Sequence, residues 1–511
     1  MDTSKICIII SIVVYLAIVI WIGFDCSKKN ATSDDFYLGG RKLGPLVTAM
    51  SAEASDMSSW LLMGLPGVAY LCGIADAGWT AIGLAVGTYL NWLIVAKRIR
   101  RYSMQTNAIT IPDFFSRRYR DDRNILMCIA AVVILIFFIP YTASGFAACG
   151  KLFASLFGFD YVKAMIVSGA VIAVYTTLGG FLAASTTDFI QSIIMTIALF
   201  VVLIFGINMA GGMDVVMENA RALPGYLGMM VTHDAATNTS SPYGFLNIVS
   251  TLAWGLGYFG MPHILLRFMA IEDERKLTLS RRVATVWVVI SMIVAVLIGI
   301  VGYSMSKVGV IPVLEGTASE TIIVRIADLL SQYGIVAALL AGVVLAGILA
   351  STMSTADSQL LAASSSVSQN LMCDVLKLKM TEKRKILVAR LTVMGITVIA
   401  MFLARNPDSS VFGIVSFAWA GFGAAFGPVV MFSLFWKRTN LWGALAGMLS
   451  GGAMVFIWKY LVRPLGGVWN IYELLPAFLT ACVAIVAVSL LTKAPDKEIT
   501  DEFEAVAAMR D

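Results

Sequence analysis

Charged residues are scarce in this chain of 511 residues. Asp, Glu, Lys and Arg make up only 14% of it, and 59% of the residues are hydrophobic. Soluble domains carry about 25% charged residues. Long apolar runs recur from end to end, as in polytopic helical membrane proteins. The composition therefore excludes a large soluble domain, and the net charge of +5 is no signature of nucleic-acid binding.

Histidine and paired cysteine are also lacking. The two histidines, His233 and His263, are too few for a histidine-based metal or haem site. The seven cysteines are scattered singly without C-x-x-C spacing, so neither a zinc site nor a disulfide framework is indicated. The chain has no G-x-x-x-x-G-K-[ST] motif and no recognisable nucleophile–base pair. We therefore expect no enzyme, no nucleotide-driven pump and no organic cofactor.

The apolar runs predict an all-α membrane protein with thirteen transmembrane helices. The approximate cores are residues 6–24, 45–72, 78–96, 125–146, 164–182, 189–209, 245–266, 283–305, 334–371, 386–403, 411–436, 442–460 and 475–491. The first run lacks a basic leader and a cleavage site, so we interpret it as a retained span. Residues 211–244 are polar and predict an external flap or a partly helical loop.

Lysine and arginine segregate between alternate loops. If the N-terminus is outside, 28 of the 37 basic residues fall in segments that would lie inside. These segments are residues 28–42, 97–123, 267–282, 377–390, 437–438 and 493–510. Because cytoplasmic loops are enriched in Lys and Arg, the pattern predicts an external N-terminus, an internal C-terminus and an odd number of spans.

A carboxylate lies at the centre of the second apolar segment. Asp56 is surrounded by the small hydroxyl residues Ser55, Ser58 and Ser59. A charge at membrane depth costs roughly 3 kcal/mol on the insertion scale and usually marks a solute or ion path. The segment therefore predicts a local helix break whose carbonyls and hydroxyls hold a small hard cation. Packing between helices by small polar residues is the alternative.

The ninth segment carries a stripe of hydroxyl groups. At i, i+3, i+4 and i+7 of one helical face stand Ser351, Ser354, Thr355 and Ser358. Such a stripe can offer oxygen ligands to Na⁺. It can equally form a seam of hydrogen bonds between helices.

Glycine and proline interrupt the seventh segment. Residues 254–263 read WGLGYFGMPH, which is unfavourable for a continuous helix. Interrupted membrane helices line a cavity or are buried in protein. Trp254 and Tyr258 are four residues apart, so they can share one face, enclose an apolar ring and offer a cation–π surface to an ammonium group. Aromatic packing beside a glycine hinge is the alternative.

The sequence does not decide the role of three further charged residues. Asp188, in the sequence STTD, is either a station on the exit path of the cation or a polar residue at a helix N-cap that faces cytoplasmic water. Glu53 is a second acid near the predicted site and can face a water-filled vestibule. Arg41 is either a topology anchor on the inside or a gating residue.

Several longer stretches resemble the sodium/solute symporter family, and within it the bacterial members that carry proline. The matching stretches are residues 35–41 (DFYLGGR), 54–58 (ASDMS), 60–67 (WLLMGLPG), 254–263, 267–270 (RFMA) and 418–428 (AWAGFGAAFGP). The resemblance extends over nearly the whole chain.

The resemblance implies a LeuT-type core of two inverted five-helix repeats, residues 45–209 and 245–436. It places one extra helix before the core, at residues 6–24. Two helices at residues 442–491 and a cytoplasmic tail at residues 493–511 follow. The first helix of each repeat would be broken, in agreement with the two interrupted segments.

The resemblance also implies the binding residues. For Na⁺ it implies the carbonyls and hydroxyls of Ala54, Met57, Ser351, Ser354 and Thr355, supported by Asp56. For the substrate, L-proline, it implies Ser58, Trp60, Tyr141, Trp254, Tyr258 and Pro262. Asp188 matches a carboxylate on the inward path of the cation.

Three positions depart from the family pattern. Glu53 and Ser59 stand where glycine is usual, and Ser351 stands where alanine is usual, so the pocket shape or the cation affinity can differ. The expected function is sodium-coupled import of L-proline by alternating access across the bacterial cytoplasmic membrane. We expect a lipid bilayer around the chain and no obligate protein partner. The alternatives are another amino acid, an organic acid, a sugar or a vitamin as cargo, coupling to Li⁺ or H⁺, and a solute-sensing receptor or a channel.

Overall fold

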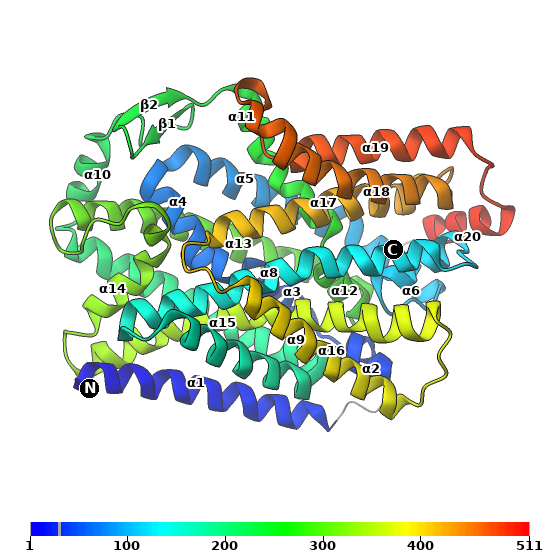
Figure 1. The fold of residues 1–511 in the computed structure, drawn as a ribbon, viewed down its shortest axis with the longest axis horizontal. Helices are drawn as coiled ribbons and strands as arrows, with labels where there is room; N and C mark the ends of the chain where they lie inside the picture. Colours follow the sequence, from blue (N-terminus) through cyan, green and yellow to red (C-terminus); the bar gives the residue numbers. More distant parts are fainter. Residues whose placement is uncertain (1, 29–31, 510–511) are drawn as a thin grey trace.

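The computed structural model describes residues 2–28 and 32–509, and its long helices lie side by side along one axis (Figure 1). Two basic residues of the predicted internal segments, Lys29 and Arg510, lie outside the described residues. The predicted helical class is confirmed. The described residues add one short antiparallel hairpin, in which β1 (Val231–Asp234) pairs with β2 (Thr239–Pro242).

The N-terminal part of the described chain forms nine α-helices. They are α1 (Thr3–Ser27), α2 (Ser33–Leu38), α3 (Pro45–Ser59), α4 (Leu65–Cys72), α5 (Ile74–Leu90), α6 (Ala96–Gln105), α7 (Ile111–Tyr119), α8 (Ile125–Phe157) and α9 (Tyr161–Met209). Side-chain caps begin some of them: Thr32 and Asp35 form a capping box at α2, and Thr110 accepts from the Asp113 amide at α7. At Gly180, α9 bends with a φ of 64°, so its two arms correspond to two predicted spans.

Eleven α-helices follow in the described chain. They are α10 (Met213–Arg221), α11 (Phe245–Leu252), α12 (Pro262–Ala270), α13 (Leu277–Lys307), α14 (Ile322–Leu330), α15 (Ile335–Ser365), α16 (Glu382–Leu403), α17 (Val411–Phe435), α18 (Leu441–Ile457), α19 (Leu474–Leu491) and α20 (Lys497–Ala508). The side chains of Ser410 and Asn440 cap α17 and α18 by accepting from the amides of Gly413 and Gly443.

Ten of the described helices are long and apolar enough to cross a membrane. Tyr161–Thr177 is a shorter apolar helix. The predicted second span is interrupted between α3 and α4, and the predicted seventh span is interrupted between α11 and α12. The predicted polar flap at 211–244 contains α10 and the hairpin, so the expectation of a partly helical loop is confirmed.

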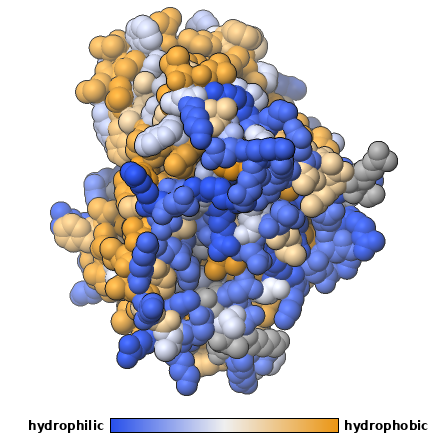
Figure 2. Space-filling view, turned by 90° about the vertical axis from the view of Figure 1, so that its right-hand side faces the viewer, coloured by the Kyte–Doolittle hydropathy of each residue, from blue (hydrophilic) through white to orange (hydrophobic). Residues whose placement is uncertain are grey.

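The two ends of the bundle differ in polarity. Figure 1 places α10 and the hairpin at the left end, and α6 and α20 toward the right end. Seen from the second end, the surface is largely hydrophilic, with apolar residues on its flanks (Figure 2). At this end, α20 is bound to the bundle by ion pairs of Glu498 and Glu502 with Arg120.

The centre of the bundle is built around α15, which contacts α1, α3, α8 and α9. Nearby, α5 crosses Ala253–Gly260, a 3₁₀ helix between α11 and α12 that we call the irregular segment, with backbone against backbone. A Cβ atom added at Gly87 would lie 2.4 Å from Gly255. Glycine allows such a close approach because it has no side chain. These contacts bring the two interrupted spans and α15 toward one buried region.

Candidate functional site

The helix break predicted around Asp56 is present and lies at Ser58. Ser58 has φ 41° and ψ −172°, and a wide helical turn, Trp60–Gly64, connects it to α4. A left-handed residue other than glycine costs roughly 1–3 kcal/mol and persists only where its surroundings hold it. The Ser58 hydroxyl accepts from the Trp60 amide at 3.1 Å, which stabilises the new helical start. Every residue from 48 to 67 is buried, so the break lies inside protein.

Asp56 connects the broken helix to the second interrupted span. Its Oδ2 accepts from the Tyr258 hydroxyl at 2.6 Å, and its backbone carbonyl accepts from the Tyr141 hydroxyl at 3.2 Å. The side chain is only 5% exposed. Three of the predicted site residues, which come from α3, α8 and the irregular segment, are therefore joined directly.

The hydroxyl stripe of α15 faces the broken helix. Ser354 Oγ donates to the Ala54 carbonyl at 2.8 Å, across 300 residues of sequence. The Ser351 carbonyl accepts from Ser354 Oγ at 3.1 Å and from Thr355 Oγ1 at 3.2 Å. Four of the five predicted cation ligands are thus linked to one another. The fifth predicted ligand is the Met57 carbonyl, which accepts from the Trp60 amide instead.

Oxygen atoms of this kind suit a hard monovalent cation better than a transition metal. In the described part of the chain, no three His, Cys, Asp or Glu side chains cluster in a way that could hold a metal ion. The Ser354 and Thr355 hydroxyls can rotate their protons away and present lone pairs. The linked carbonyls and hydroxyls therefore offer ligands for an ion such as Na⁺ without a second full charge.

Aromatic rings enclose the space above Asp56. The Trp254 ring lies 5.7 Å from Trp60, 5.5 Å from Phe412 and 5.0 Å from Tyr472, measured between ring centroids. Trp419 fixes the backbone of this segment by donating from Nε1 to the Trp254 carbonyl at 2.7 Å. An apolar ring can pack here because several π faces converge.

The cavity inside this aromatic group is small in the present conformation. It measures about 10 Å³ and is lined by Asp56, Trp60, Leu84, Tyr141, Trp254, Val415 and Trp419. A cavity of this size has room for about one water molecule. The predicted pocket residues Trp60, Tyr141 and Trp254 line it directly, and Tyr258 reaches it through Asp56. Pro262 is buried at the start of α12, beyond the lining residues.

Three aromatic residues of this group were missed by the sequence reasoning. Trp419 lies within the stretch 418–428, which carries the family resemblance, so that motif could have indicated it. Phe412 and Tyr472 have no such signal. They reach Trp254 only because the starts of α17 and α19 fold over the irregular segment.

Glu53 does not line the aromatic cavity but bonds to α5 and to the turn that follows it. Its Oε1 accepts from the Thr88 hydroxyl at 2.9 Å and from Trp92 Nε1 at 2.8 Å, and the side chain is 1% exposed. The interpretation that it faces a water-filled vestibule is wrong for this conformation. Ser59 is also fully buried, one residue after the break.

Asp188 lies in a polar network and not at a helix terminus. It is completely buried within α9, so the prediction of an N-cap that faces cytoplasmic water is wrong. Its Oδ2 accepts from Arg267 Nη2 at 2.9 Å and from Ser51 Oγ at 2.6 Å. Arg267 also donates to the Ser358 hydroxyl at 2.6 Å. The sequence reasoning missed Arg267 as part of the site.

This network directly adjoins the predicted cation ligands. Ser51 lies three residues before Ala54 on α3, and Ser358 lies four residues after Ser354 on α15. Ser358 Oγ donates to the Ser354 carbonyl at 2.9 Å. The Arg267–Asp188 ion pair therefore borders the site on the side where α12 packs against α6.

A second ion pair closes the hairpin side. Lys151 Nζ lies 2.7 Å from Glu320 Oε2. Glu320 also accepts from the Ser410 hydroxyl and from the amides of Val411 and Phe412. It thereby anchors the start of α17 and holds Phe412 over the rings of the two tryptophans. A recess of about 280 Å³, whose lining includes Asp76, Thr251 and Arg463, lies outside this cover.

Arg41 binds three segments together at the other end. It donates to the carbonyls of Ala108 and Met269 at 2.6 and 2.9 Å and to the Ser103 hydroxyl at 3.1 Å. It therefore ties the start of the broken span to α6 and to the end of α12. Whether it serves as an anchor or a gate stays a prediction.

Comparison with known proteins agrees with this geometry. The profile of the Sodium:solute symporter family matches residues 36–451. The osmoregulated proline transporter OpuE of Bacillus subtilis is 40% identical over 491 residues, which cover 96% of both chains. The sodium/proline symporter of Salmonella typhimurium is 40% identical over 501 residues, 97% of this chain and 95% of that protein.

Solved structures show the same fold. A Na⁺-coupled sialic acid symporter, solved in a substrate-bound outward-open state, matches with a TM-score of 0.78 and 17% identity over 96% of this chain and 99% of that one. A nucleobase-cation-symport-1 family transporter in a closed conformation matches with a TM-score of 0.51 and 14% identity, covering 92% and 98%. The chain is thus an integral multi-pass membrane protein, a transporter rather than an enzyme, and it belongs to the sodium:solute symporter family.

Proposed function

We propose that this protein imports L-proline together with Na⁺ across the bacterial cytoplasmic membrane by alternating access. The observation that carries the proposal is the bond between Ser354 and the Ala54 carbonyl, which sets a hydroxyl stripe against a broken helix directly beside Asp56. The relatives named as proline transporters, at about 40% identity over nearly the whole chain, support proline as the cargo.

In this proposal Na⁺ binds at Ala54, Met57, Ser351, Ser354 and Thr355. It draws α3 and α15 together, and the Met57 carbonyl turns toward the ion when it enters. The support is the existing linkage of the other four oxygens. Asp56 contributes negative charge nearby and orients Tyr258.

The proposed substrate pocket consists of Ser58, Trp60, Tyr141, Trp254, Tyr258 and Pro262. The carboxylate of proline binds the amides exposed at the helix break, where the positive end of the helix dipole favours an anion. The pyrrolidine ring packs on Trp254, and its ammonium group is attracted to the aromatic faces. The cavity must widen from its present size to hold this cargo.

We further propose thirteen transmembrane helices, with the N-terminus outside and the C-terminus inside. Supporting this count, the ten long helices, the shorter Tyr161–Thr177 and the two interrupted spans add up to it. The core would comprise two inverted repeats, residues 45–209 and 245–436. One helix at 6–24 would precede them, two at 442–491 would follow, and residues 493–511 would form the cytoplasmic tail.

Release toward the inside would require the Arg267–Asp188 network to open, and Asp188 would then meet the departing cation. The driving force is sufficient for concentrative uptake. One charge that crosses 100 mV yields about 2.3 kcal/mol, and a tenfold gradient requires about 1.4 kcal/mol, so one Na⁺ sustains roughly 50-fold accumulation.

Proteoliposomes that contain only this protein test the proposal. An inward Na⁺ gradient is expected to drive uptake of labelled proline above its external concentration, and replacement of Na⁺ by choline is expected to abolish it. Competition by a panel of amino acids, organic acids, sugars and vitamins identifies a different cargo. Proline uptake that ignores the Na⁺ gradient would refute the proposed coupling.

A further inference from the structure

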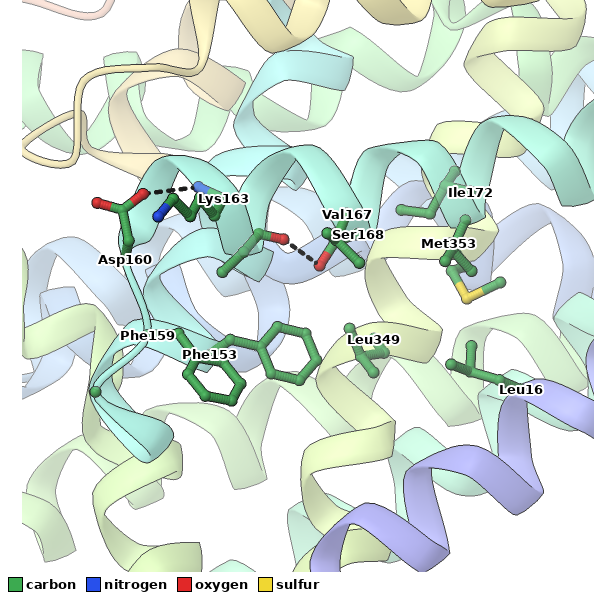
Figure 3. A pocket seen from close by; sticks show the side chains of 13 residues that line it. Leu16, Phe153, Phe159, Asp160, Lys163, Val167, Ser168, Ile172, Leu349 and Met353 are labelled. Atoms are coloured by element: carbon green, nitrogen blue, oxygen red, sulfur yellow. Dashed lines mark hydrogen bonds between the residues drawn. The ribbon is translucent and has the colours of Figure 1, made fainter.

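A cavity of about 560 Å³ lies between α1, α8, α9 and α15, apart from the site described above (Figure 3). Its lining is almost wholly apolar. Leu16 comes from α1, Phe153 from α8, Val167 and Ile172 from α9, and Leu349 from α15. Water gains few hydrogen bonds in such a space, so an apolar occupant suits it.

The cavity adjoins the face of the bundle that contacts the membrane interior. Along the first arm of α9, Ile166, Val167 and Val174 are 45%, 63% and 59% exposed. Apolar side chains so exposed on a membrane-spanning helix face hydrocarbon. The neighbouring molecules at this cavity are therefore lipids.

One end of the cavity is charged. Figure 3 shows Asp160 and Lys163 at this end, and Met353 and Leu16 at the other. The Asp160 carboxylate caps α9 by accepting from the Lys163 backbone amide at 3.0 Å. The Lys163 ammonium group is exposed and has no ion pair among the described residues. It is available to an anionic group at the membrane surface.

The depth of the cavity matches one leaflet. From Lys163 to Ile172 the helix advances nine residues, about 14 Å at 1.5 Å per residue. Half of the hydrocarbon core of a bilayer measures about 15 Å. A chain that starts at Lys163 therefore passes along the whole cavity before it reaches the bilayer centre.

We propose that this cavity binds one acyl chain of a glycerophospholipid, whose phosphate group lies against Lys163. The far end of the chain contacts Leu349 and Met353 on α15. Ser351 and Ser354 stand on the same two turns of that helix. The bound lipid therefore supports α15 where it carries the hydroxyl stripe. This last consequence rests on the proposed sodium-coupled function, whereas lipid binding itself does not.

Native mass spectrometry of the purified full-length chain with added phosphatidylglycerol tests the binding. Val167→Trp fills the cavity, and it is expected to remove most of the retained lipid. Ile166→Trp is the matched control, because Ile166 is exposed on the same turn without lining the cavity. Val171→Phe, deeper in the cavity, repeats the test should Val167→Trp fail to fold. Equal retention by the cavity variants and by wild type would overturn the proposal.

The headgroup contact has its own test. Lys163→Gln is expected to weaken phosphatidylglycerol binding about fivefold, the effect of one Lys near an anionic lipid. Unchanged binding would overturn the assignment of the phosphate to Lys163.

The Na⁺ dependence of uptake tests whether the bound lipid supports α15. In proteoliposomes, Val167→Trp is expected to raise the Na⁺ concentration for half-maximal uptake, and Ile166→Trp is expected to leave it unchanged. An unaltered Na⁺ dependence in Val167→Trp would overturn this link. If wild type shows no Na⁺-dependent uptake at all, the proposed function fails, and the mass spectrometry still decides whether lipid binds.

Discussion

The two closures of the central site are built differently. On the hairpin side, aromatic rings cover the cavity and Glu320 anchors Phe412. Glu320 accepts from a hydroxyl and two amides in addition to Lys151. On the opposite side, Asp188 Oδ2 accepts from Arg267 and from the Ser51 hydroxyl, and its Oδ1 has no hydrogen-bond partner among the described residues. Glu320 therefore keeps several hydrogen-bond donors when one is removed, whereas Asp188 depends mainly on Arg267.

The difference also concerns what each closure touches. The Arg267 network shares α3 and α15 with the predicted cation ligands, through Ser51 and Ser358. The aromatic cover lines the small cavity beside Asp56 and reaches one predicted cation ligand, Met57, whose carbonyl accepts from the Trp60 amide. In the proposed orientation, the Arg267–Asp188 pair forms the inner closure and the Lys151–Glu320 pair with the aromatic rings forms the outer closure. Under the proposed function, Na⁺ acts most directly on the inner closure and the cargo acts on the outer one.

The largest effect is expected from Arg267→Met. It leaves Asp188 buried with one remaining donor, and breaking a buried ion pair costs roughly 3–5 kcal/mol. We expect uptake to be nearly lost and the melting temperature of the purified protein to fall. The double variant Arg267→Met with Asp188→Asn removes both charges of the ion pair and should recover part of the stability. Near-normal uptake in the single variant would show that transport does not require the Arg267–Asp188 pair.

A large shift is expected from Ser354→Ala combined with Thr355→Ala. Hydrogen bonds to charged groups contribute about 1.5–3 kcal/mol each, so the Na⁺ concentration for half-maximal uptake should rise at least about tenfold. Ser364→Ala is the control, because that hydroxyl donates to the Leu361 carbonyl on the same helix and is not one of the predicted ligands. The same Na⁺ dependence in both variants would show that the stripe is merely a packing seam.

A moderate effect is expected from Trp254→Ala. The loss of one aromatic face should weaken proline binding by about tenfold, since aromatic and cation–π contacts contribute on the order of 1 kcal/mol each. Sodium affinity, measured by calorimetry without proline, should change little. Trp442→Ala, at an exposed position, controls for loss of a tryptophan. If Trp254→Ala weakened proline binding and Na⁺ binding equally, the two closures would not act separately.

The smallest effect is expected from Lys151→Met. Glu320 keeps its hydroxyl and two amide donors, so the cost should stay near the lower end of roughly 1.5–3 kcal/mol, the value of one hydrogen bond to a charged group. Uptake and melting temperature should therefore fall far less than in Arg267→Met. A loss as severe as that of the inner variant would abolish the contrast between the closures.

The sequence predicted the local features well. Small hydroxyl residues around Asp56 indicated a break, and the structure places it at Ser58. Glycines in 254–263 indicated an interrupted span, and that segment is irregular. These features depend on propensity over a few residues, which a single sequence carries directly.

The partners of these features were not predictable in the same way. Asp56 bonds to Tyr258 across 202 residues, and Arg267 reaches Asp188 across 79. Such pairs depend on which helix faces meet, and hydropathy does not determine that. Arg267 also sits among basic residues that explain the topology, so nothing local distinguished it. The N-cap interpretation of Asp188 failed because α9 runs on past it and bends at Gly180 instead.

The contact of Gly87 with Gly255 limits how this carrier can acquire new cargo. A methyl group at either position would force α5 away from the irregular segment. We therefore expect α5 and the irregular segment to move together during transport. A change of cargo is therefore expected to involve Trp60 and Tyr141, whose side chains line the cavity.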